Sequence, residues 1–300
     1  MNKLFPDLLV RSSSLIAALI ASTLLILGLS SAHAQLASSI STAPTNKVVP
    51  GEVVWADLVT TDVETAIAFY AQVFGWEIRR SDDPGYVELA HNGGVICAVA
   101  KFDDDDVTPG NARWLVSISV ADVDEVAAKV ESRGGSVLEP PEDFPDRGRI
   151  AVIGDGQGAV FMLLRASGGD PSGDGHVADA WGWAELWTRD VEKAVAFYEE
   201  VVGYRAIRTP GESGQRPVVL STGKQARATI VQIPWNDVQP NWLPYVPVTD
   251  GRATIQRIES AGGSVLLTSD EVGDDAGSFA AIIADPTGGV FAIQEMEARQ

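Results

Sequence analysis

Residues 55–76 read WADLVTTDVETAIAFYAQVFGW, and residues 183–204 repeat them as WAELWTRDVEKAVAFYEEVVGY. Thirteen of the 22 aligned positions are identical. The same offset of 128 residues also relates Trp114-Leu115 to Trp242-Leu243. Because chance does not preserve one offset over so long a stretch, the sequence indicates an internal duplication of a single domain.

Within each copy, the repeated stretch predicts a strand, a helix and a turn. Residues 53–59 read as a half-buried strand, and Asp62 is placed to cap the helix that follows. The apolar residues of 66–74 have helical spacing, and Gly75 suits the left-handed residue that ends such a helix. Short β-rich runs come next, and the pattern then starts again at Trp114. We therefore predict four βαβββ modules, two in each half.

This order of elements resembles the vicinal oxygen chelate superfamily, the group of glyoxalases, bleomycin-resistance proteins and extradiol dioxygenases. The marks are Phe69-Tyr70 and Phe197-Tyr198 in the helices, and an Asp-Pro-x-Gly turn that is intact at Asp285–Gly288 and altered at Asp155–Gly158. The Trp-x-(Asp/Glu)-Leu-x-Thr motif at the start of each half resembles that of a subgroup of two-domain bacterial glyoxalase-like proteins. The resemblance implies an α+β fold of tandem glyoxalase-like domains, whose modules form two incomplete eight-stranded barrels with a concave pocket inside each.

The first residues have the pattern of a secretory signal peptide. Lys3 and Arg11 precede the uncharged apolar run 15–29, and residues 31–34 (SAHA) offer the small side chains that a signal peptidase reads. This run is shorter than the roughly 20 residues that a membrane-spanning helix needs. We expect residues 1–34 to be removed after Ala34, which leaves a periplasmic or secreted protein without a membrane segment.

The rest of the chain divides at segments rich in small and polar residues. Residues 35–50 are predicted to be a flexible lead-in, and residues 168–178 a linker. The two glyoxalase-like domains then span 51–167 and 179–297, and we expect them to pack against each other.

Composition excludes several classes of partner. The formal net charge is −19, so nucleic acids and anionic membrane surfaces, which favour basic patches, are not expected partners. The single cysteine, Cys97, excludes an intramolecular disulfide. Stability must therefore come from buried cores.

The resemblance also implies where a metal would bind, because metal-dependent members use His, Gln or Glu at three strand positions of a domain. These positions fall on Trp55, Leu115 and Met162 in the first half and on Trp183, Leu243 and Ala292 in the second. Only Met can coordinate at all, and it is a soft ligand. His91, in an Asn-Gly-Gly turn, and His176, in the linker, are interpreted as solvated loop residues. We predict neither a metal ion nor another cofactor.

Aromatic side chains stand where the metal ligands would be. Trp55 and Trp183 occupy the first position of each half, and Trp114 and Trp242 flank the second. Such walls favour a flat or apolar ligand, although the same rings could instead fill the barrels as core. The predicted ligand-binding residues are Trp55, Asp57, Trp114, Leu115, Ser117, Met162, Trp183, Glu185, Trp242, Leu243, Tyr245 and Ala292.

Asp57 and Glu185 are the candidate catalytic carboxylates. Each follows its Trp by two residues on a strand, so both side chains should point into the same cavity. In a poorly solvated pocket a carboxyl pKa rises, and the group could act as a general base. The alternatives are an ion pair with Arg113 or Arg149, or a wet position at the rim.

The leading interpretation is an exported, metal-independent protein that binds an apolar or aromatic small molecule. The alternative is an enzyme, either a lyase, isomerase or oxygenase with displaced metal ligands or one that uses Asp57 or Glu185 as a base. A third interpretation is an interaction scaffold with filled cavities. Differences such as Asp57 against Glu185 and Ser117 against Tyr245 predict two unlike pockets.

Overall fold

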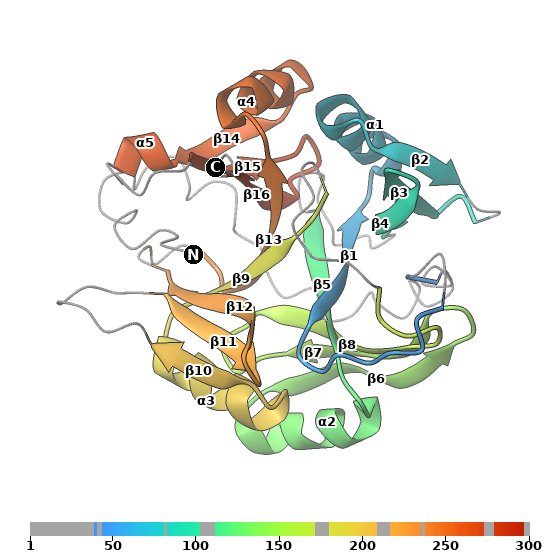
Figure 1. Cartoon of the computed structure of the whole chain (residues 1–300), viewed down its shortest axis with the longest axis vertical. Coiled ribbons are helices and arrows are strands. Elements are labelled where there is room, and N and C mark those ends of the chain that lie inside the picture. Colours follow the sequence, from blue (N-terminus) through green and yellow to red (C-terminus); the bar gives the residue numbers. More distant parts are fainter. Residues whose placement is uncertain are drawn as a thin grey trace.

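Each copy of the duplication forms one mixed β-sheet with helices on one side (Figure 1). The computed structural model describes residues 39–40, 44–80, 83–102, 112–171, 180–208, 217–233, 235, 238–272 and 279–296. The predicted signal peptide, His176 and most of the predicted linker lie outside these residues. None of the helices in the described part is long and apolar enough to cross a membrane.

In domain 1 the described elements follow the predicted order, βαβββ twice. They are β1 (Val53–Thr60), α1 (Val63–Phe74), β2 (Glu77–Arg80), β3 (Tyr86–His91), β4 (Gly94–Lys101), β5 (Arg113–Ser119), α2 (Val123–Val130), the 3₁₀ helix η2 (Glu131–Arg133), β6 (Ser136–Phe144), β7 (Gly148–Gly154) and β8 (Val160–Ala166).

Domain 2 repeats this order and adds one short helix. Its elements are β9 (Trp183–Thr188), α3 (Val191–Val201), β10 (Arg205–Arg208), β11 (Val218–Thr222), β12 (Gln225–Gln232), β13 (Asn241–Val248), α4 (Gly251–Ser260), β14 (Ser264–Thr268), α5 (Ser269–Val272), β15 (Ala280–Ala284) and β16 (Val290–Glu295).

The two sheets have the same topology. Over the described strands, the order is β2-β3-β4-β1-β5-β8-β7-β6 in domain 1 and β10-β11-β12-β9-β13-β16-β15-β14 in domain 2. The two modules of each sheet meet at the antiparallel pair of their opening strands, β1 with β5 and β9 with β13. The sheets stay open rather than closing into barrels, which confirms the predicted fold class.

The repeated Asp is a helix-start signal in all four modules. Its side chain accepts a backbone N–H three residues further on, as in the 3.1 Å bond from Thr65 N to Asp62 Oδ1. The equivalent residues Asp122, Asp190 and Asp250 cap α2, α3 and α4 in the same way. Each bond satisfies an N–H at the helix start that has no partner within the helix.

The outer face of each sheet packs against the other domain. Figure 1 shows α1 beside α4 and α2 beside α3, so each pair joins one helix from each half. Two buried clusters extend across the boundary: one combines β1, α1 and β16, and the other combines β5, α2, α3 and β12. The halves therefore share their main apolar cores.

The tyrosine of each Phe-Tyr motif makes a buried polar contact across this boundary. Tyr70 Oη donates to Asp285 Oδ2 at 2.7 Å, and Tyr198 Oη donates to Asp155 Oδ2 at 3.3 Å. Each Asp belongs to the turn before the last strand of the other domain. Burial raises the pKa of both tyrosines well above its ordinary range, so they remain donors. The altered turn at Asp155 has thus kept its interdomain partner.

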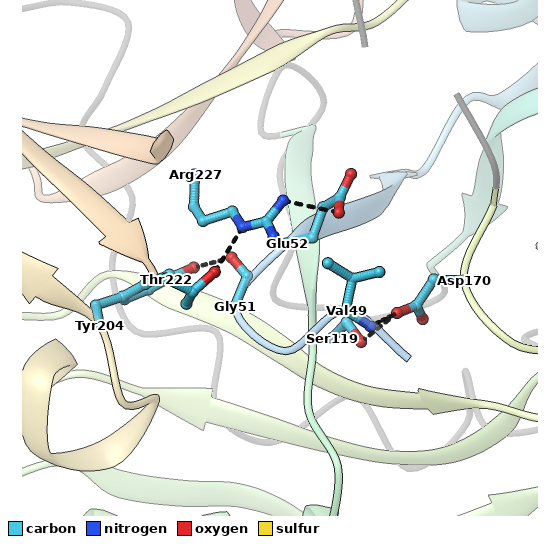
Figure 2. A network of polar contacts seen from close by, with 8 residues as sticks. All are labelled: Val49, Gly51, Glu52, Ser119, Asp170, Tyr204, Thr222 and Arg227. Carbon is cyan, nitrogen blue, oxygen red and sulfur yellow. Dashed lines mark hydrogen bonds and ion pairs between the residues drawn. The ribbon is translucent and has the colours of Figure 1, made fainter. Parts of the chain in front are cut away.

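The lead-in is held by hydrogen bonds at residues 44–50, where the sequence predicted a flexible segment. Asp170 accepts from Val49 N at 2.6 Å and from Ser119 Oγ at 2.7 Å (Figure 2). The backbone N–H of Asp170 donates to Lys47 O. A composition of small and polar residues did not indicate this contact with a carboxylate 121 positions away.

Gly51 and Glu52, the two residues between the lead-in and β1, also contact domain 2 (Figure 2). Tyr204 Oη donates to Gly51 O at 2.6 Å, and Arg227 Nη1 pairs with Glu52 Oε2 at 2.9 Å. Gly51 has φ +83°, and a Cβ there would lie 2.6 Å from Thr222 Cγ2. Glycine is therefore required both by the backbone conformation and by the close approach of domain 2.

Candidate functional sites on the inner faces

The inner face of a sheet is the face that does not join the interdomain clusters. In domain 1, strand pairing sets Trp55 opposite Ser117, Asp57 opposite Leu115, and Ser117 beside Met162. Directly paired residues project to the same side of a sheet. The structure therefore brings these five predicted residues together on the inner face.

Domain 2 repeats the arrangement with different side chains. Trp183 lies opposite Tyr245, Glu185 lies opposite Leu243, and Tyr245 lies beside Ala292. These five predicted residues share the inner face of the second sheet.

Trp114 and Trp242 lie on the outer faces, in contrast to the other predicted binding residues. Trp114 is paired with Leu58, so it points away from Asp57 into the interdomain core. The indole N–H groups of Trp114 and Trp242 donate to Tyr70 Oη at 3.1 Å and to Tyr198 Oη at 3.0 Å. Strand parity explains the difference, because each Trp is one residue away from the Leu that faces inward.

Asp57 is the centre of a buried polar cluster in domain 1. Its Oδ1 accepts from Trp55 Nε1 and from Tyr86 Oη, each at 2.9 Å, and lies 3.4 Å from Arg147 Nη2. Arg147 also donates to the Tyr86 hydroxyl, and its guanidinium carbon lies 4.8 Å from the centre of the Trp55 ring. The carboxylate is thus paired with a stacked cation from its own chain.

The arginine in this pair differs from the two that the sequence suggested. Arg149 binds Asp124 at the surface, and neither Arg149 nor Arg113 contacts Asp57. Arg147 lies in the turn between β6 and β7, and the curl of the sheet brings this turn over β1. Burial alone would lower the pKa of Arg147, but the Tyr86 and Asp57 oxygens raise it above its ordinary value.

The inner face of domain 1 is largely filled. Trp55, Tyr86 and Arg147 are each 1% exposed, and Ile40 of the lead-in is buried in the same cluster. In this domain Trp55 is core, as one interpretation of the sequence held.

In domain 2 the equivalent carboxylate, Glu185, is fully buried among neutral donors. Oε1 accepts from Thr229 Oγ1 at 2.7 Å, and Oε2 accepts from Tyr245 Oη at 2.6 Å and from Trp187 Nε1 at 3.4 Å. Trp183 Nε1 extends the network to Thr229 Oγ1 at 3.3 Å. Burial raises the pKa of Glu185, and the three hydrogen bonds only partly offset this effect.

Aromatic rings line this second face, and two of them are only half-buried. Trp187 stacks on Trp235 with ring centres 6.1 Å apart and planes inclined by 18°. Trp183 and Trp235 are half-buried, whereas Trp55, the counterpart of Trp183 in domain 1, is buried. The face of domain 2 is therefore the more accessible of the two.

The side chains at the predicted metal positions do not fit a divalent ion. Indole, Leu and Ala side chains cannot donate to it, and the thioether of Met162 suits soft metals. Within the described ranges, no three His, Cys, Asp or Glu side chains come together in a group that could hold a metal. We therefore derive no chemical step through a metal ion.

Sequence reasoning missed several members of these faces: Ile40, Tyr86, Arg147, Thr229 and Trp235. Thr229 lies on β12, which pairs with the opening strand β9, and Tyr86 lies on β3, which β4 separates from the opening strand β1. The pairing register of these strands would have revealed both residues. Nothing local indicates Arg147 or Ile40, because both reach the face from turns or loops.

The chain matches the family model described as Glyoxalase/Bleomycin resistance protein/Dioxygenase superfamily over residues 52–163 and 175–293. It is 32% identical to the Mycobacterium bovis protein named "Putative glyoxylase CFP32" over 80% of this chain and 92% of that protein. It is 31% identical to the anthracycline biosynthesis protein DauV of Streptomyces sp. (strain C5), over 83% of this chain and 95% of the relative.

A solved structure with a similar fold is the Mn(II)-bound glyoxalase from Novosphingobium aromaticivorans. The TM-score is 0.56 at 16% identity, over 83% of both chains. At this identity the likeness is one of fold. With both halves matched by the family model, the chain belongs to the Glyoxalase/Bleomycin resistance protein/Dioxygenase superfamily.

Proposed function

We propose that this protein binds a small molecule without a metal ion, on the inner face of domain 2. The observation that carries the proposal is that half-buried Trp183 and Trp235 share this face with the buried carboxylate Glu185. Accessible indole rings offer a flat or apolar ligand a stacking surface, and a single polar group can fix its orientation.

Domain 1 has a structural part in this proposal. Arg147 already pairs with Asp57 and covers Trp55, and Ile40 occupies the same face. A ligand would have to displace these groups, so we expect one binding site per chain rather than two.

The binding experiment uses intrinsic fluorescence and thermal shift across a panel of flat aromatic compounds, with and without EDTA. We expect saturable binding that EDTA leaves unchanged. Trp183→Leu removes a stacking ring and should weaken binding by roughly two- to tenfold. Trp181 is also half-buried but packs against the interdomain clusters, so Trp181→Leu is the matched control. Equal effects of the two substitutions, or a requirement for divalent metal, would contradict the proposal.

We also propose that the protein is exported, on the basis of the signal-peptide pattern in residues 1–34. The N-terminus of protein recovered from the periplasm or medium should be Gln35. Recovery of the intact chain from the cytoplasm alone would contradict export.

A second candidate is proton-transfer catalysis at Glu185. It is favoured by the raised pKa of this carboxyl and by the 2.6 Å bond from Tyr245 Oη, which fixes one carboxylate oxygen. If this is correct, Glu185→Gln should abolish turnover of a ligand that still binds. Turnover that survives the substitution would eliminate this candidate.

A further inference from the structure

The two domains carry a carboxylate at the same place on the inner face, but they neutralise it differently. Asp57 has Arg147 beside it, with the guanidinium stacked on Trp55 and at 5.7 Å from the Tyr86 ring centre. In domain 1 the Arg147 guanidinium is thus an organic cation that belongs to the chain itself and is bound by a carboxylate and aromatic rings.

Glu185 has the rings but no such cation. Its contacts are Thr229, Tyr245 and Trp187, which are all neutral donors. No Arg or Lys in the described part of the chain forms an ion pair with it. A buried carboxylate without a counter-charge is costly, so a cation placed beside it gains more attraction than it would in water.

Hydrogen-bonding capacity also remains at this carboxylate. An ionised carboxylate offers about four acceptor sites, and Glu185 accepts three hydrogen bonds. One acceptor site of the carboxylate is therefore left for an N–H of an ammonium, amidinium or guanidinium group.

The aromatic side chains around Glu185 suit the body of such a ligand. Trp183 occupies the position of Trp55, the ring on which Arg147 stacks in domain 1. The stacked pair Trp187 and Trp235 adds a second indole surface on the same face. Cations bind favourably over indole faces, and this attraction strengthens where water is excluded.

We propose that the inner face of domain 2 binds an organic cation, with its charged nitrogen beside Glu185 and its apolar or aromatic body against Trp183 and Trp235. The inference rests on the proposed function, because it names the ligand class of that same site. The overall charge of −19 should speed the approach of a cation but does not select a place for it.

The test compares three probes of nearly equal shape, benzamidinium, benzamide and benzoate, by isothermal titration calorimetry on the mature protein at 0.15 M salt. We expect benzamidinium to bind roughly tenfold or more tightly than benzamide, because a hydrogen bond to a charged group exceeds a neutral one by about that factor. Benzoate should bind most weakly.

Two substitutions separate the site from the general charge of the protein. Glu185→Gln should reduce benzamidinium affinity to that of benzamide. Glu192→Gln removes the same charge from the exposed face of α3 and should leave all three affinities unchanged. If Glu185→Gln folds poorly, the probe series is compared between the unsubstituted protein, Glu192→Gln and Trp183→Leu, and a cation preference that only Trp183→Leu reduces supports the site.

Three results would overturn the inference. Equal affinity for the charged and neutral probes, with loss of both on Trp183→Leu, would keep the proposed binding function and reject the cation. A cation preference that Glu192→Gln reduces as much as Glu185→Gln would assign the effect to general charge instead. If none of the probes binds while the aromatic panel does, the ligand class is wrong and the binding function stands.

Discussion

Replacing Arg147 by Met tests whether the cation in domain 1 is part of the fold. Arg147 and Asp57 are each 1% exposed, and removal of one partner from a buried ion pair costs about 3–5 kcal/mol. Asp57 keeps the donors Trp55 and Tyr86, and Arg147 Nε has no hydrogen-bond partner among the described residues. We therefore expect the low end, about 3 kcal/mol lost from the free energy of unfolding.

A second substitution separates the charge from the packing. In the double variant Arg147→Met, Asp57→Asn the buried charge is gone, and the amide oxygen can still accept from Trp55 and Tyr86. Because removing both members of a buried pair can be nearly neutral, we expect the double variant to recover about 2 kcal/mol relative to Arg147→Met.

The assay is urea unfolding followed by both circular dichroism and tryptophan fluorescence. Arg149→Met is the matched control: it lies two residues away, but its partners Asp124 and Asp143 are at the surface. Its unfolding midpoint should stay near that of the unsubstituted protein, since exposed pairs contribute little. The reasoning is refuted if Arg147→Met lowers the free energy of unfolding by less than about 1 kcal/mol. It is also refuted if the double variant is less stable than Arg147→Met.

Three further predictions concern Glu185, the interdomain tyrosines and Gly51. The raised pKa of Glu185 gives a contribution to stability that is present below pH 4.5 and is lost as pH rises through the folded-state pKa. As pH rises through the folded-state pKa, the free energy of unfolding of Glu185→Gln should therefore increase relative to that of the unsubstituted protein. If the difference between the two free energies does not change with pH, the prediction is wrong. Tyr198→Phe leaves Asp155 Oδ2 without its donor and should cost about 1–3 kcal/mol in urea unfolding, whereas no loss would mean that the contact is not formed. Gly51→Ala forces a left-handed residue against Thr222 and should cost about 1–2 kcal/mol or more, with proteolysis reporting looser domains; unchanged protease resistance would count against this.

The residues of the inner faces could be predicted from sequence where the alternation of side chains along a strand decides which face they occupy. Asp57 follows Trp55 by two residues, and alternation places both on one face whatever the rest of the fold does. The same rule should have excluded Trp114, which is one residue out of phase with Leu115. Its aromatic character suggested a pocket, whereas its N–H is used by Tyr70 in the interdomain core.

The lead-in and the arginine partner could not be derived in this way. Ile40 and Arg147 reach the face of domain 1 from outside the strands that form it. Which turn lies over which strand depends on how far the sheet curls, and that is decided by packing across the whole domain rather than by local pattern. Composition likewise could not reveal that Asp170 fixes residues 44–50.

The sequence by itself determined the duplication, the four modules, their capping residues and the absence of hard or borderline donors at the metal positions. Each of these depends on residue identity at fixed spacing, which a repeat preserves. Only the tertiary structure decided that the two halves share a core, that domain 1 pairs its carboxylate with Arg147, and that Glu185 has neutral partners. These features depend on contacts between residues 44 to 215 positions apart, which chain geometry and packing set together.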